Sequence, residues 1–357
     1  PLKEDLDPGP GAKTRPVASQ RLGKLRRSSL FDEKFYLAQA GEKVSRIGDP
    51  ARHLAEEGSL EGISFVQPER MEEEIWGLDA GWSRPEFDYI RPPSAEKSPS
   101  VAPLVHSSLG APVGTTVAIY SNSQGNAFHH EMAKLLEYGF RATGAEVSLR
   151  DENHAPDREA SHSVVVAPHE FFALGEGQKR CTAEFLENCH LFLAEQPGSR
   201  YFSMCLWYGL RARGVLDINP LSAVVWSELG VHARALPLGY VEGYPAYEEG
   251  VDFGHSSARR SLEPSAYNWK GRLADPLVER PIDVFFNGVL SDRREWFFAS
   301  NARHLAPHRC ALFMPTPSVP IEAALPSALD ERTATALSQR SKIHLNIHRS
   351  DFPYFEW

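Results

Sequence analysis

The feature that most constrains the fold is a repeated alternation of short apolar runs with amphipathic segments, which begins near residue 115. The run 116–120 is almost continuously apolar and lies between Gly114 and Ser121, as in a strand buried on both faces of a parallel sheet. The segment 126–143 carries apolar residues at helical spacing, and Gly144 ends it. Strands and helices in this order predict right-handed crossovers and a doubly wound α/β sheet.

The alternation continues along most of the remaining chain. In the first series we expect further strands at 146–149, 163–167, 191–194, 215–218 and 233–236, and helices at 178–188, 201–213 and 221–229. After a polar, Gly- and Pro-rich interruption, a second series has strands at 282–286, 309–314 and 343–347, and helices at 292–305 and 328–340. Three strands alone would leave a hydrophobic sheet edge, so we expect the second Rossmann-like domain to be incomplete.

A small helical unit precedes the first sheet. Asp49-Pro50 is a strong helix start, because Asp caps the free amides and Pro suits the first helical position. The expected organisation is a poorly ordered tail (1–29), a helical module (30–90), a linker (91–114), a first Rossmann-like domain (115–242), an interdomain segment (243–279) and the start of a second such domain (280–357).

Charge and cysteine content exclude several classes of protein. With 38 Lys and Arg against 47 Asp and Glu, the net charge of -9 argues against a nucleic-acid partner. No apolar run is long enough to span a bilayer, and the polar start is not a secretory signal. Four cysteines without a C-x-x-C pair indicate reduced thiols in a cytoplasmic protein, with no disulfide framework. The basic strip 13–27 is interpreted as a solvated tail, and peripheral docking on anionic lipid is the alternative.

Candidate site residues in the first domain follow its strands. The loop after 116–120 contains Ser123, Gly125 and Asn126, whose small side chains leave backbone amides open to a phosphate or a sugar hydroxyl. His129 and His130 come next and are candidates for a general base, with capping or surface roles as the alternative.

A second candidate group follows the strand at 191–194. Glu195 and Gln196 form a carboxylate–amide pair suited to vicinal sugar hydroxyls on the acceptor side, although a helix-start turn explains them equally well. Glu195 is also a catalytic candidate, together with His129 and His130. Asp217 and Asn219 are similarly placed after a strand, but there Asn219 is better explained as a helix N-cap.

The second domain offers a candidate anion site. Gly288 makes the turn after 282–286, and Arg293 and Arg294 lie at the next helix start, where cations oppose the helix dipole. A diphosphate bound at this helix start would pair with both arginines and make their placement favourable. The alternative is that the two arginines lie on a solvated helix face.

The segment 342–348 alternates apolar and polar residues. A strand there would place His344, Asn346 and His348 on one face, and Lys342 precedes them. A central strand with polar residues would need partners for them. No acid shares that face, so we expect no metal.

These elements resemble CgeB-like and related family-one bacterial glycosyltransferases. The resemblance rests on 286–294 with its Gly-x-Leu-x-x-Arg-Arg pattern, on 342–348 (Lys-Ile-His-Leu-Asn-Ile-His) and on Phe355-Glu356. Glu195-Gln196 and 237–240 are similar to the acceptor-domain pattern of this family, and 31–54 resembles a short module found beside bacterial polysaccharide glycosyltransferases.

The resemblance implies a metal-independent GT-B enzyme with two facing Rossmann-like domains. It would use a nucleotide-sugar as co-substrate, need no cofactor, and act on a glycan or lipid-linked glycan in surface polysaccharide biosynthesis, near the inner membrane. The implied donor residues are Gly288, Arg293, Arg294, Lys342, Asn346, His348 and Glu356. A non-catalytic sugar-binding scaffold and a nucleotide-sugar epimerase on the same fold are the alternatives.

Overall fold

The computed structural model describes residues 17–67, 112–245, 262–271, 276–316, 329–347 and 349. Contacts between α-carbons divide these residues into two units. The first contains the described residues up to Ser123 and those from Gly139 to Gly239, and the second contains Gln124–Tyr138 and the described residues from Tyr240 onward. Among the described residues no helix combines the length and apolarity needed to cross a bilayer.

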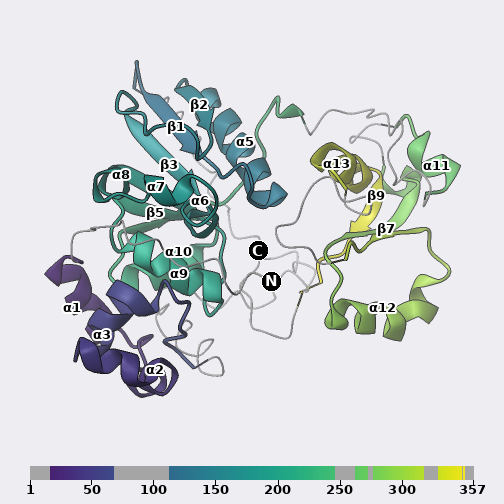
Figure 1. Cartoon of the computed structure of the whole chain (residues 1–357). Coiled ribbons are helices and arrows are strands. Elements are labelled where there is room, and N and C mark those ends of the chain that lie inside the picture. The colour runs from purple at the N-terminus through teal and green to yellow at the C-terminus, as the bar shows by residue number, and fades with distance from the viewer. Residues whose placement is uncertain are drawn as a thin grey trace, which may run out of the picture. The chain divides into compact units, whose positions relative to one another are not determined.

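The first unit is built on a six-stranded parallel sheet with the order β2-β1-β3-β4-β5-β6 (Figure 1). Its strands are β1 (Thr116–Tyr120), β2 (Glu146–Arg150), β3 (His162–Val166), β4 (Cys189–Leu193), β5 (Gly214–Asp217) and β6 (Ala233–Ala235). The order runs outward in both directions from β1 and β3, which makes this pair the topological switch point where α/β proteins bind ligands. The predicted α/β class and all six predicted strands of this sheet are confirmed.

The connecting helices differ from expectation in three ways. They are α5 (Ala127–Ala142), α6 (Pro168–Phe171), α7 (Gly177–Arg180), α8 (Ala183–Asn188), α9 (Arg200–Gly209) and α10 (Pro220–Glu228). The helix α6 was not predicted, the helix predicted at 201–213 ends at Gly209, and the single helix predicted at 178–188 is wrong because it is divided. The side chain of Thr182 accepts a hydrogen bond from the Phe185 amide and so starts a new helix, α8.

A fully buried aromatic pair joins α9 and α10 under the sheet. Phe202 and Trp226 stack with ring centroids 3.9 Å apart and an interplanar angle of 22°. The Trp226 indole also donates to the carboxylate of Asp217 at the end of β5 (2.8 Å). The stacked pair and this hydrogen bond therefore link both helices to the carboxyl end of β5.

The N-terminal helical unit consists of short helices that pack beside α9 (Figure 1). Its elements are α1 (Ser19–Arg27), α2 (Glu33–Ala40), the 3-10 helix η1 (Gly41–Arg46), α3 (Pro50–His53) and the π-helix η2 (Leu54–Gly58). The Asp49 side chain accepts from the Arg52 amide, so the predicted helix start is confirmed. The segment 19–27, expected in the tail, is helical and buries Leu25. Residues 68–111 of the expected module and linker lie outside the described part of the chain.

The second unit contains a three-stranded parallel sheet with the order β8-β7-β9. Its elements are α11 (Pro264–Tyr267), the 3-10 helix η6 (Leu277–Glu279), β7 (Ile282–Asn287), α12 (Asp292–Leu305), β8 (Cys310–Phe313), α13 (Glu331–Gln339) and β9 (Ser341–His344). The core between this sheet and α13 contains Phe285, Ala336 and Leu337. The predicted helix at 292–305 is confirmed.

The last strand of this sheet was predicted too far along the chain. The strand β9 ends at His344, so Asn346 lies beyond it and the predicted three-residue face does not form on it. β9 is also at an edge of the described sheet rather than at its centre, and Ile343 is 55% exposed. His344 is therefore exposed to solvent, whereas the buried hydroxyl of Ser341 donates to the Leu337 carbonyl at 2.6 Å.

Candidate functional site

The candidate site of the first unit lies at the carboxyl ends of β3 and β4. Glu195 follows β4 by two residues, and His169 follows β3 at the start of α6. The Glu195 Oε1 atom is 3.5 Å from His169 Nε2, and Ser199 Oγ donates to Glu195 Oε2 at 3.4 Å. The Ser199 hydroxyl also caps α9 by accepting from the Phe202 amide at 3.0 Å. One carboxylate is thus fixed by two neighbours on separate elements.

An unusual backbone conformation directs His169 toward this carboxylate. Ala167 has φ 49° and ψ 68°, and among the described residues other than glycine it alone has a positive φ. Its amide is held by the carbonyl of Phe192 on β4 at 3.0 Å. A non-glycine residue in this region costs about 1–3 kcal/mol, and such strain is concentrated at functional sites.

His169 is almost fully buried between two residues of α9. The Sγ atom of Cys205 lies 3.6 Å from His169 Nδ1, and the Tyr201 ring lies 5.0 Å from the imidazole. Burial raises the pKa of the Cys205 thiol well above its usual value, and the nearby Glu195 charge adds to this. Burial therefore favours the neutral thiol of Cys205, which is a weaker nucleophile and metal ligand than the thiolate. Glu195, with 19% of its side chain exposed, is the more accessible member of the Glu195–His169 pair, since His169 is 5% exposed.

Asp217 is a second carboxyl group at the same edge of the sheet, but it is fully buried. It accepts hydrogen bonds from the Trp226 indole and the Asn219 amide, each at 2.8 Å. Burial raises the pKa of Asp217 to about 7, and the charge of Glu195 contributes in the same direction. Asn219 accepts from the Leu221 amide at 2.9 Å, which confirms its predicted role as the N-cap of α10.

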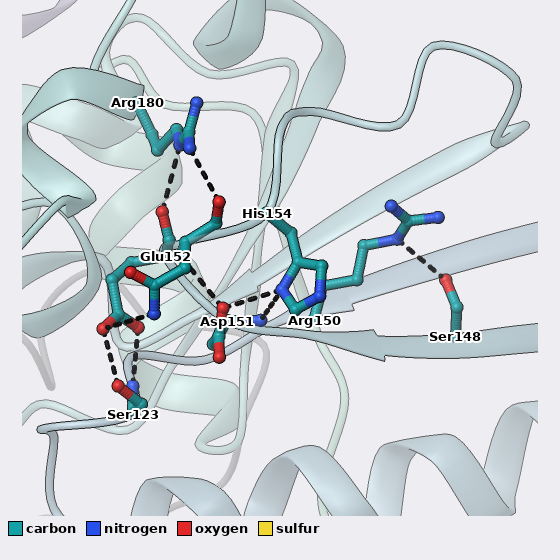
Figure 2. Close-up of polar contacts among 8 residues, drawn as sticks. Ser123, Ser148, Arg150, Asp151, Glu152, His154 and Arg180 are labelled. Carbon is teal, nitrogen blue, oxygen red and sulfur yellow. Dashed lines mark hydrogen bonds and ion pairs between the residues drawn. The ribbon is translucent and has the colours of Figure 1, made fainter.

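A buried carboxylate holds the loop after β1 (Figure 2). Glu152, which is 1% exposed, accepts from the Ser123 amide at 2.7 Å and from its hydroxyl at 2.6 Å. Arg180 donates to the carbonyls of Glu152 (3.0 Å) and Asn153 (2.9 Å). The backbone amide that we expected Ser123 to offer to a ligand is therefore engaged by a carboxylate of the protein, which also binds the Ser123 hydroxyl.

The other first-domain candidates lie around the start of α5. Asn126 accepts from the Phe128 amide through its side chain (3.0 Å), and its carbonyl accepts from the amides of His129 and His130. His129 is 7% exposed and its ring contacts that of Phe128, with centroids 5.8 Å apart. Asn126 is thus a capping residue, and the two histidines form the first turn of the helix.

In the second unit, Arg294 is bonded to backbone carbonyls. Its Nη1 donates to the Val289 carbonyl at 2.6 Å and its Nε to the Ile347 carbonyl at 2.9 Å. The guanidinium also lies 5.3 Å from the centre of the Phe286 ring. The first turn of α12 contains two acids as well, Asp292 and Glu295, which favour the helix dipole. A bound anion is therefore not needed to explain why Arg294 lies at the start of a helix, because backbone carbonyls already bind its guanidinium.

The donor candidates are brought together only in part: Gly288 lies against Arg294, where an added Cβ would be 3.0 Å from Nη1, whereas Lys342 lies near the amino end of β7. Lys342 Nζ pairs with Asp283 Oδ1 at 2.7 Å, and Asp283 also binds Arg309, so both cations hold the pKa of this carboxyl well below its usual range. Asp283 precedes Gly288 by five residues on the extended β7 strand, so its α-carbon is about 16 Å from that of Gly288 and Lys342 pairs near the opposite end of the strand. Asn346 is exposed beyond β9, while His348 and Glu356 lie outside the described residues.

Sequence reasoning identified Glu195 but missed its partner His169. The only signal for His169 in the sequence was Pro168 directly after an apolar strand. Gln196 and Gly125 lie in the loops after β4 and β1, as expected, and Arg293 lies in the first turn of α12. Comparison of the chain with protein-family models, with curated proteins and with solved structures found no match.

Proposed function

We propose that this chain is a glycosyltransferase of the GT-B type, whose six-stranded unit binds the acceptor and whose Glu195 is the general base. The observation that carries the proposal is a partly exposed carboxylate, held by His169 and Ser199, at the edge of the sheet where α/β proteins bind their ligands. The resemblance of the sequence to family-one glycosyltransferases supports the choice of reaction.

The proposed reaction is a single displacement. Glu195 accepts the proton of an acceptor hydroxyl while the hydroxyl oxygen attacks the anomeric carbon of the donor sugar. The bond from that carbon to the diphosphate oxygen breaks, and the nucleoside diphosphate leaves with the bonding electron pair. A base that activates the acceptor in one step predicts inversion at the anomeric carbon. His169 orients Glu195 rather than reacting, since it is buried against Cys205 and Tyr201.

The donor is proposed to bind in the second unit, at the turn from β7 to α12. Gly288 and Arg293 are the described candidates there, and His348 and Glu356 are added by resemblance alone. Lys342 is left out because it pairs with Asp283 near the amino end of β7. Neutralisation of the departing diphosphate by cations and a helix terminus requires no metal ion.

A panel of UDP-, GDP- and dTDP-sugars tests the proposal. We expect one nucleotide class to raise the thermal midpoint of the purified chain, and a sugar to be transferred when glycan acceptors are added. Stabilisation without transfer or hydrolysis would replace the enzyme by a sugar-binding scaffold, and interconversion of donors would replace it by an epimerase. If no nucleotide-sugar changes the thermal midpoint or is consumed, the proposal is wrong.

A further inference from the structure

Helix α9 links the candidate site to the N-terminal helical unit. At its start, Ser199 contacts Glu195, and farther along Tyr201 and Cys205 contact His169. Its opposite end meets the N-terminal unit, and η2 and α9 lie in direct contact. The orientation of the site residues therefore depends on what holds this helix.

Arg21 of α1 binds the carbonyl end of α9. Its Nη1 donates to the carbonyls of Leu210 at 2.5 Å, Ala212 at 3.1 Å and Gly209 at 3.3 Å. The last carbonyls of a helix have no partners within the helix and carry the negative end of its dipole, so a guanidinium there stabilises it. Arg21 thus acts as a C-terminal cap supplied from a distant part of the sequence.

An ion pair between the buried Arg211 and the partly buried Glu56 makes the second connection. Arg211, directly beyond α9, pairs with Glu56 Oε2 at 2.7 Å and donates to the Ala55 carbonyl at 3.0 Å, and its guanidinium lies 4.0 Å from the centre of the Trp207 ring. The Trp207 indole donates to the Glu56 carbonyl at 3.0 Å. Ala55 and Glu56 belong to the π-helix η2, a type of turn found mostly at functional positions.

A third contact lies at the start of α9. Gly62 of the N-terminal unit has φ +69°, and a Cβ atom added there would lie 2.3 Å from Cγ of Arg200. The backbone of Gly62 therefore packs directly on the first residue of α9. Both ends of the helix are in contact with the N-terminal unit.

We infer that the N-terminal helical unit, residues 17–67, is a positioning element of the Glu195–His169 site and acts through α9. It fixes the register of α9, so that Ser199 meets Glu195 while Tyr201 and Cys205 enclose His169. The catalytic meaning of this inference rests on the proposed function, but the positioning itself is testable without activity.

The test compares full-length variants by hydrogen exchange and by NMR of the His169 imidazole. Glu56→Gln removes the charge facing Arg211, and Arg21→Met removes the cap of α9. Lys43→Met is the matched control, because it breaks the exposed Lys43–Glu61 pair (2.8 Å) within the same unit without touching α9. We expect the first two variants to speed exchange in the first turn of α9 by about tenfold or more relative to β1, since Glu56→Gln removes the charge that pairs with Arg211 and Arg21→Met removes the hydrogen bonds that cap the helix.

The His169 resonances give the readout that a merely stabilising role would not move. We expect Glu56→Gln and Arg21→Met to shift them and Lys43→Met to leave them unchanged. The inference is overturned if exchange rises equally in α9 and β1, or if the His169 resonances stay in place in both variants. Should the wild-type chain transfer no sugar, the proposed function fails, while the exchange and NMR results still decide the positioning role.

Discussion

The buried carboxyl group of Asp217 predicts a specific dependence of stability on pH. Its pKa is raised from 3.8 to about 7, mainly by burial, although both of its oxygens accept hydrogen bonds. The native state therefore retains a proton that the unfolded chain releases. Because the unfolded state binds fewer protons between these two values, stability falls as pH rises through this window and levels off above about pH 7.

The expected magnitude follows from the difference between the two pKa values. A shift of about three pH units corresponds to about 4 kcal/mol, at 1.36 kcal/mol per unit. The variant Asp217→Asn cannot titrate at this position. The difference in unfolding free energy between the wild type and this variant isolates the contribution of Asp217, because the other titrating groups are common to both proteins.

Urea unfolding of both proteins at about pH 4.5, 6 and 8 provides the assay. We expect the wild type to lose stability relative to Asp217→Asn by a few kcal/mol between about pH 4.5 and 7, with little further change above that. A difference that stays constant across this range would show that Asp217 is ionised in the native state throughout. That result would refute the argument that burial outweighs the two hydrogen bonds.

Three further variants test local contacts by urea unfolding or ligand binding. Ser199→Ala removes the N-cap of α9, and a loss of about 1 kcal/mol is expected; an unchanged urea midpoint would contradict the capping role. Gly58→Ala would place a Cβ 1.9 Å from the Tyr36 hydroxyl and break its 2.6 Å bond to His53, so a loss of roughly 2 kcal/mol is expected, whereas wild-type stability would exclude this packing. Arg294→Lys should destabilise the second unit by about 1–3 kcal/mol, because the hydrogen bonds from the guanidinium to two backbone carbonyls are lost. Weaker nucleotide-sugar binding at unchanged stability would instead indicate that Arg294 binds the donor.

The sequence predicted most strands of the six-stranded sheet because they are short apolar runs between polar turns, although β2 and β6 contain charged residues. Parallel strands buried on both faces leave such a pattern, and β1 and β3 show it clearly. The pattern misled at 343–347, where alternation suggested a strand that in fact ends at His344. An alternation of apolar and polar residues indicates which way the side chains point in an extended segment. It does not indicate where the strand ends, which depends on pairing with the neighbouring strand, here β7.

The candidate site could be predicted only in part, because it depends on contacts between distant segments. Glu195 was found from its position after a strand, a local feature. His169 owes its place to the backbone of Ala167 and to Cys205, which is 36 residues away, and neither leaves a local pattern. The carbonyl partners of Arg294 could not be predicted for a similar reason. One of them belongs to Ile347, which is 53 positions along the chain.

The most direct test of the account is the rate of sugar transfer by Glu195→Gln. The amide keeps the shape of the side chain but cannot accept the acceptor proton, so we expect the rate to fall by about 100-fold or more at unchanged donor affinity. Glu176→Gln is the matched control, because this exposed acid pairs with Lys179 on α7 away from the site. A wild-type rate in Glu195→Gln, or an equal loss in both variants, would contradict the assignment of Glu195 as the base.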